Sequence, residues 1–122
     1  MNQIYERMLT ALKVLTANVG EGWFIIMEEP ESEFFVQFAF DEGSGLVFDC
    51  PTMSFSEEEM ARATRVMQRF GIELENLSDD EFASFNADIG MDIEKAAQIG
   101  SSMFREVFMF SDNTPFNIVI NC

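Results

Sequence analysis

Apolar residues recur every three or four positions in three stretches of the chain, which is the spacing of an amphipathic helix. The first stretch covers residues 2–18. The second begins after Ser56, which opens a capping box, and ends at Gly71, a residue suited to the left-handed position that terminates a helix. The third runs from Ile93 to about Phe110. The pattern therefore predicts three helices.

Apolar and polar residues alternate between the first two predicted helices, which is typical of β-strands. Residues 22–28 are too few for a helix and are rich in aromatic and β-branched side chains. Residues 33–41 alternate most regularly, and residues 46–50 continue the alternation after a glycine-containing loop at residues 41–45. These segments predict a three-stranded antiparallel meander.

The pattern is less regular in the second half of the chain. Residues 73–81 are interpreted as an acidic loop. Residues 82–89 alternate like a strand, although Ser78 and Glu81 could instead cap a helix, and we favour the strand. Residues 116–120 alternate as a last strand. The sequence thus predicts a single α+β domain of 122 residues, in which an antiparallel β-meander packs against helices in the order α-β-β-β-α-β-α, with a possible C-terminal strand.

Both faces of the predicted meander are apolar. The residues expected to face the helices are Phe34, Val36, Phe38, Phe40, Leu46 and Phe48. The residues expected on the opposite face are Phe24, Ile26, Phe35, Gln37, Ala39 and Val47. Packed against the C-terminal strand, this second face would be ordinary core; otherwise it would be a patch for a second subunit or a client segment. The candidate partner-binding residues are Phe24, Ile26, Phe35, Gln37 and Val47.

Charge narrows the classes of partner. The chain has 22 Asp and Glu against 7 Lys and Arg, a net charge of -15, and no histidine, so it lacks the commonest general base and metal ligand. This balance disfavours nucleic acid and anionic membrane surfaces as partners, and no apolar run approaches the ~20 residues that span a bilayer. Because Glu6, Arg7 and Lys13 interrupt the N-terminal apolar residues, we expect no signal peptide and a cytoplasmic location.

The residues with reactive side chains form no recognisable catalytic or metal motif. Acids alternate within residues 88–94, but no calcium-loop register exists, so helix capping is favoured over a metal. Neither Lys13 nor Lys95 lies in a motif that would activate a nucleophile. Cys50 and Cys122 form no CxxC motif and are interpreted as a buried thiol and a tail thiol, with a disulfide as the alternative. We predict no cofactor, no metal and no catalytic residue, while paired carboxylates that meet only in three dimensions stay open.

Three arginines follow three glutamates in the second predicted helix. Arg62, Arg65 and Arg69 could bind a carboxylate of a partner. Such a stripe more commonly forms a solvated face with salt bridges along the helix. We favour the solvated face.

The order of elements, the small size and the acidity together resemble the type III secretion chaperone-like group that includes the YbjN-like and TY-Chap families. The resemblance is carried by Phe34-Phe-Val-Gln-Phe-Ala39 in a central strand, by the capped helix Ser56–Gly71, and by the segment from Ala96-Ala97 through Phe104-Arg-Glu-Val-Phe108. It implies a non-enzymatic role in holding a partner polypeptide or in regulation, often as a homodimer. The possible extra C-terminal strand departs from the simplest version of that fold.

We therefore expect an acidic, chaperone-like protein-binding domain that engages a protein or peptide of basic character through a sheet face or edge. One alternative is an immunity protein that neutralises a basic toxin, whose acidic helical surfaces would mimic nucleic acid. A lesser alternative is a carboxylate-based enzyme, which predicts a concave pocket holding an acid of raised pKa.

Overall fold

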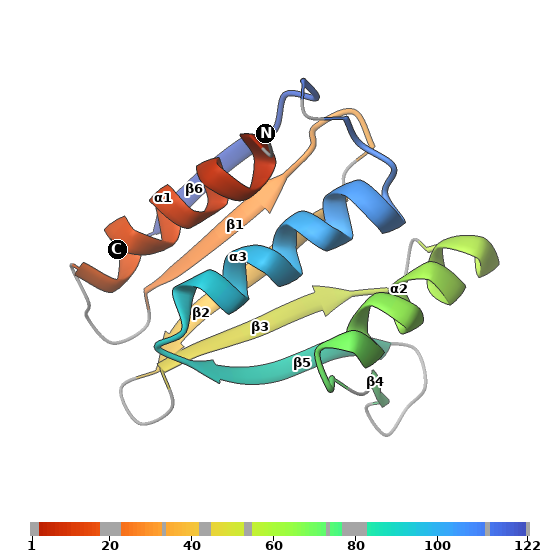
Figure 1. The fold of residues 1–122 in the computed structure, drawn as a ribbon, viewed down its shortest axis with the longest axis horizontal. Helices are drawn as coiled ribbons and strands as arrows, with labels where there is room; N and C mark the ends of the chain where they lie inside the picture. Colours follow the sequence, from red (N-terminus) through yellow and green to blue (C-terminus); the bar gives the residue numbers. More distant parts are fainter. Residues whose placement is uncertain are drawn as a thin grey trace.

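Three helices lie across one face of a six-stranded antiparallel sheet (Figure 1). The computed structural model describes residues 3–17, 23–32, 34–41, 45–52, 55–72, 74–76, 83–111 and 113–121. The strands lie in the order β4-β5-β3-β2-β1-β6, so that β4 and β6 form the two edges. The predicted α+β class is confirmed, and the C-terminal strand is present.

The helices are α1 (Gln3–Ala17), α2 (Glu57–Arg69) and α3 (Ile93–Ser102). α1 and α2 begin and end close to their predicted limits, and α3 begins at its predicted start. The capping box is formed: the Ser56 hydroxyl accepts the Glu59 backbone N–H at 3.1 Å, and the Glu59 carboxylate accepts the Ser56 N–H at 2.8 Å. Gly71 has a φ of +72°, the left-handed conformation expected after a helix.

The strands include the predicted meander. They are β1 (Phe24–Glu28), β2 (Phe35–Asp41), β3 (Gly45–Pro51), β4 (Leu74–Asn76), β5 (Ala83–Gly90) and β6 (Asn117–Asn121). The strand favoured over a helix at residues 82–89 is confirmed as β5, which pairs with β3. The hairpin loop predicted between β2 and β3 lies, at residues 42–44, outside the described residues.

Two details of the sequence interpretation were wrong. Part of the predicted acidic loop is the edge strand β4, a three-residue strand that is too short to show a periodicity and is defined by its pairing with β5; residues 77–82 lie outside the described residues. The third helix does not stay α-helical to Phe110: α3 passes into a π-helical turn, η1 (Met103–Val107), in which the Phe108 N–H donates to the Met103 carbonyl at 3.0 Å. One wider turn hardly changes the apolar spacing, so the pattern could not reveal it.

The core lies between the helices and the sheet. It takes alternate residues of each central strand, and its fully buried members there are Ile25, Met27, Val36, Phe38, Leu46, Phe48 and Cys50. A Cβ added at Gly100 would lie 2.8 Å from the Met8 sulfur, so the glycine allows α1 and α3 to approach closely. No described helix is both long and apolar enough to cross a lipid bilayer.

Candidate docking surface

All five candidate partner-binding residues lie on the sheet face opposite α1, α2 and α3. We call this surface the outer face; its apolar members are Phe24, Ile26, Phe35, Ala39 and Val47, and it also contains Gln37. Each of these side chains is half-buried, whereas the intervening strand residues belong to the core. The alternation in the sequence therefore predicted the two faces of the meander correctly.

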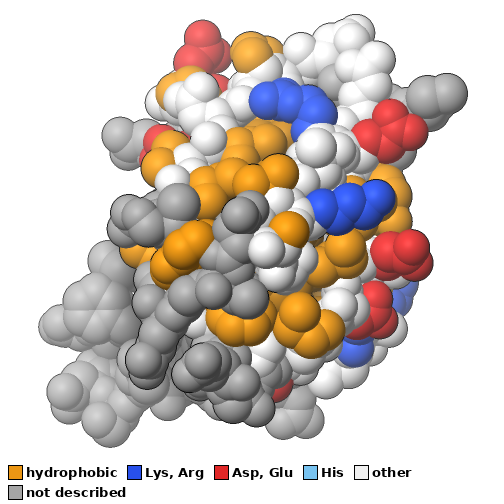
Figure 2. Space-filling view, turned by 90° about the vertical axis from the view of Figure 1, so that its left-hand side faces the viewer, with side chains coloured by type: hydrophobic (Ala, Val, Ile, Leu, Met, Phe, Trp, Pro, Cys, Tyr) orange, Lys and Arg blue, Asp and Glu red, His pale blue; other side chains and the backbone are white. Residues whose placement is uncertain are grey.

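Strand register brings the outer-face residues into one continuous surface. Ile26 lies opposite Gln37 on β2 and opposite Val119 on β6, and Ala39 lies between Phe24 and Val47. Val119 is 53% exposed, which extends the apolar surface to the edge strand. Figure 2 shows the molecule from the left-hand side of Figure 1, a view that does not face the outer face squarely; hydrophobic side chains lie there in several patches, with Lys, Arg, Asp and Glu side chains to their right.

The C-terminal strand does not cover the outer face. β6 pairs in register with β1, from Glu28 opposite Asn117 to Phe24 opposite Asn121, and so extends the sheet sideways. The described helices lie on the other side of the sheet (Figure 1). Of the two interpretations offered by the sequence, core packed beneath the last strand does not hold for these described elements.

Acidic side chains border the apolar part of the outer face. Asp49 lies opposite Gln37, Asp88 lies opposite Val47, and Glu28 lies opposite Phe35. None of the six strands contains a lysine or an arginine. The sheet therefore presents apolar side chains in a negatively charged setting, without a basic residue on any strand.

A groove runs between α1 and the edge strand β6. Its volume is about 610 Å³, and its lining residues are Gln3, Glu6, Arg7, Thr10, Ala11 and Ile118. Arg7 is held at one end, because its guanidinium donates to the Phe116 carbonyl at 3.0 Å and lies 4.0 Å from the centre of the Phe116 ring. No pattern in the sequence predicted this groove, since it depends on α1 packing beside the last strand.

The arginine stripe of α2 lines a second groove, of about 500 Å³, against η1. Arg62 donates to the Val107 carbonyl through Nη2 at 2.9 Å and through Nε at 3.3 Å. Arg69 forms an ion pair with Glu106. The predicted solvated face with salt bridges along the helix thus describes the stripe only in part. Arg62 lies 4.0 Å from the Glu58 carboxylate of the same helix, but Arg62 and Arg69 also reach a segment far away in the chain.

Among the described residues, Glu29 and Cys50 have shifted pKa values. The Glu29 carboxylate accepts the backbone N–H of Glu31 at 2.7 Å and of Ser32 at 2.9 Å, and the Glu31 bond in particular holds the pKa of Glu29 below its ordinary value, against the effect of burial. Burial, and secondly the charge of Asp49, raise the pKa of the Cys50 thiol. Glu29 therefore stays ionised, and Cys50 stays a protonated core residue.

The structure shows the roles of Cys50 and Asp92, two residues whose side-chain chemistry was interpreted from the sequence. Cys50 is a free, buried thiol as expected, while Cys122 lies outside the described residues. Asp92 caps α3 by accepting the Lys95 backbone N–H at 3.1 Å, which agrees with the capping role favoured for the acids of this segment. Among the described residues, no group of three Cys, Asp or Glu side chains is arranged to hold a metal ion.

Comparison with family models, with curated proteins and with solved structures returns no match to this chain.

Proposed function

We propose that this protein is a non-enzymatic, chaperone-like binding domain whose outer face holds a basic, amphipathic segment of a partner polypeptide in the cytoplasm. The observation that carries the proposal is the composition of that face. Apolar side chains from β1, β2 and β3 adjoin Glu28, Asp49 and Asp88, on a sheet whose strands contain no basic residue.

Such a surface selects its partner in two ways. Apolar side chains favour a segment that can bury its own apolar residues, at roughly 25 cal/mol per Å² of apolar area. The adjoining carboxylates favour lysine and arginine and repel an acidic segment, which affects specificity and association rate more than final affinity. A second copy of this strongly acidic chain is a less complementary partner for the same surface, so the proposal commits to a basic polypeptide rather than to a homodimer.

The arginine stripe of α2 favours the outer face of the sheet, and not the helices, as the docking surface. An immunity protein that mimics nucleic acid would need a continuous acidic helical surface. On α2, the acidic first turn Glu57–Glu59 is followed directly by Arg62, Arg65 and Arg69. This reversal of charge disfavours a basic toxin on that helix.

The proposal is tested with a fluorescent synthetic peptide in which lysine and valine alternate, followed by fluorescence anisotropy at low and high salt. We expect saturable binding that weakens with salt. Phe35→Asp places a charge on the outer face at the start of β2, opposite Glu28, and we expect it to weaken binding by about tenfold or more. The matched control is Met91→Asp, which adds the same charge at an exposed turn residue outside the strands.

Two results would contradict the proposal. One is equal weakening by Phe35→Asp and Met91→Asp, which would mean that only net charge matters. The other is equal binding of a peptide in which glutamate replaces lysine. Circular dichroism of both variants checks that the fold is retained, and sedimentation of the free protein reports whether the outer face is already occupied by a second copy.

A further inference from the structure

Positive charge gathers in one groove of this acidic protein. The groove between α2 and η1 has a volume of about 500 Å³, and its lining residues are Arg62, Arg65, Val66, Arg69 and Glu106. Three of the chain's seven basic residues line it, against a single acid. The lining therefore has a local positive charge, in contrast to the net charge of -15 of the whole chain.

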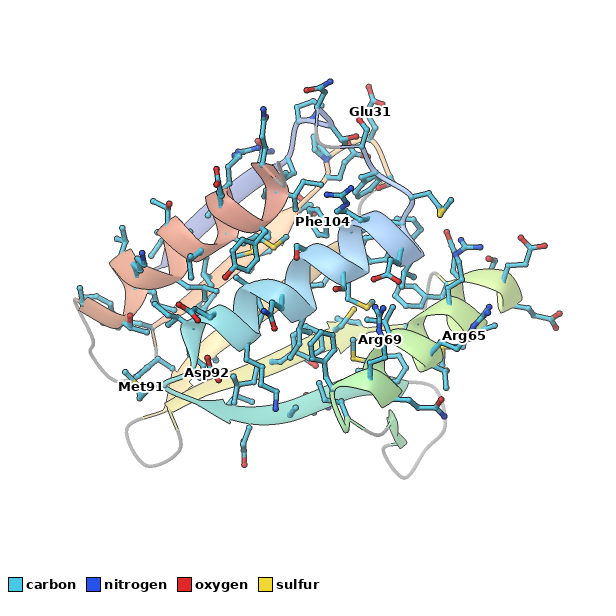
Figure 3. All side chains as sticks on the ribbon, viewed as in Figure 1. Glu31, Arg65, Arg69, Met91, Asp92 and Phe104 are labelled. Carbon is cyan, nitrogen blue, oxygen red and sulfur yellow. The ribbon has the colours of Figure 1, made fainter. Side chains whose placement is uncertain are left out.

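The three arginines differ in how they are engaged. Arg62 is fixed by its two hydrogen bonds to the Val107 carbonyl, and its guanidinium also lies 4.0 Å from the exposed Glu58 carboxylate. Arg69 is paired with Glu106, and both side chains are about half exposed. Arg65 is exposed and makes no hydrogen bond or ion pair with any residue that the structure describes, and Figure 3 shows it projecting from α2 near Arg69.

The wall opposite these arginines has an irregular backbone. It is the π-helical turn η1, and Met109 just beyond it has a φ of +63°, a left-handed conformation that residues other than glycine rarely adopt. π-helical turns and residues in rare backbone conformations are both frequent at functional sites. Here Arg62 holds the turn against α2, so that the groove keeps its shape without a ligand.

We propose that this groove binds an oxyanion, a carboxylate or a phosphate group, attached to a small apolar body. Arg65 and Arg69 would donate to the oxyanion, because a guanidinium offers paired N–H groups that match these planar or tetrahedral acceptors. Val66 in the lining would contact the apolar body. Arg62 is a positioning residue that acts through Val107.

The charge balance restricts the ligand to a small one. A groove of about 500 Å³ falls within the range of roughly 300–1,000 Å³ that is usual for small-molecule sites. A polyanion such as nucleic acid would reach past the arginines to the many acids elsewhere on the surface and be repelled. The site lies on the helical side of the sheet and is independent of the outer face.

Glu106 gives the site an internal competitor. Its carboxylate already occupies Arg69, so an incoming oxyanion must take over that guanidinium or share it. Removing the Glu106 charge should therefore tighten binding, whereas removing the Arg65 charge should weaken it. If only net charge mattered, removing a positive charge far from the groove would weaken binding as much as removing that of Arg65.

The test is an NMR titration of the wild-type protein with inorganic phosphate, phenyl phosphate and benzoate, followed on the arginine Nε–H signals. We expect saturable shifts at Arg65 and Arg69, tighter binding of phenyl phosphate than of inorganic phosphate, and a preference between phenyl phosphate and benzoate that identifies the oxyanion. Arg65→Gln should weaken binding about tenfold or more, because it removes a charge-assisted pair of hydrogen bonds. Glu106→Gln should tighten it by about two- to fivefold, the range of an exposed ion pair.

Lys13→Gln is the control, because it removes one positive charge from an exposed residue of α1. It should leave the affinity within about twofold of wild type, which is the most that a distant, screened charge is expected to contribute. The proposal is overturned if no probe gives saturable shifts at these arginines, or if Arg65→Gln and Lys13→Gln have the same effect. Binding of inorganic phosphate as tight as that of phenyl phosphate would remove the apolar body from the proposal.

Discussion

The two faces of the central strand should differ sharply in what they contribute to stability. Phe38 on β2 is fully buried, and its ring centre lies 5.4 Å from that of Phe48. Phe38→Ala removes a buried ring and leaves a cavity between sheet and helices, which typically costs about 3–5 kcal/mol. Phe35 lies three residues earlier on the outer face and is only half-buried. Phe35→Ala loses part of the transfer free energy of the ring but opens to solvent instead of forming a cavity, so we expect a cost of about 1–2 kcal/mol.

The difference of about 2 kcal/mol between the two variants is measurable by urea denaturation, since stabilities of single domains are about 5–15 kcal/mol. Trp23, the only tryptophan of the chain, provides a fluorescence signal to set beside circular dichroism, and coincident transitions would support two-state unfolding. If Phe38→Ala leaves too little folded protein, Phe38→Leu gives the same comparison at lower cost. Equal destabilisation by Phe35→Ala and Phe38→Ala would refute the reasoning, because it would make the outer face a second core.

The remaining predictions concern Gly45 and the two side chains with shifted pKa values, Glu29 and Cys50. Gly45 has a φ of +83°, and a Cβ there would lie 2.6 Å from the Gly90 backbone, so Gly45→Ala should cost at least about 2 kcal/mol, read from the urea midpoint. Because folding lowers the pKa of Glu29, its ionised carboxylate stabilises the fold at pH values above its ordinary pKa of 4.5, and this contribution is lost as the pH falls through the pKa of the folded state. Glu29→Gln should therefore be less stable than wild type at neutral pH, and the two should become equally stable in acid. A difference in stability that does not change with pH would contradict this. The raised pKa and full burial of Cys50 predict that, in a Cys122→Ser background, a thiol reagent reacts only after urea unfolding, and rapid reaction of the native protein would be the contrary result.

Much of the fold could be predicted because its signals are local. Strict alternation over residues 33–41 assigned Val36 and Phe38 to the core and Phe35 and Gln37 to the outer face, since neighbouring strand residues point to opposite sides. The capping box at Ser56 fixed the start of α2 for the same reason, because the hydrogen bonds it makes span only three residues.

The missed features depend on contacts between distant residues. The strand β4 has three residues and is stabilised by pairing with β5. The turn η1 keeps nearly the same apolar spacing as an α-helix, and its partner Arg62 lies 45 residues before Val107. The groove beside α2 could not be predicted either, although the spacing of the three arginines gave its only sequence signal.

The sequence by itself determined where the three helices begin and where five of the six strands lie, which side of each central strand is apolar core, and that the chain is strongly acidic and lacks histidine. Tertiary structure decided that the last strand extends the sheet beside β1 instead of covering the outer face, and that α2 packs on η1 so that Arg62 and Arg69 reach residues 45 and 37 positions away. The physical reason is one of range. Backbone preference, capping and side-chain alternation act over a few residues, whereas the order of strands and the walls of a groove depend on the packing of the whole chain.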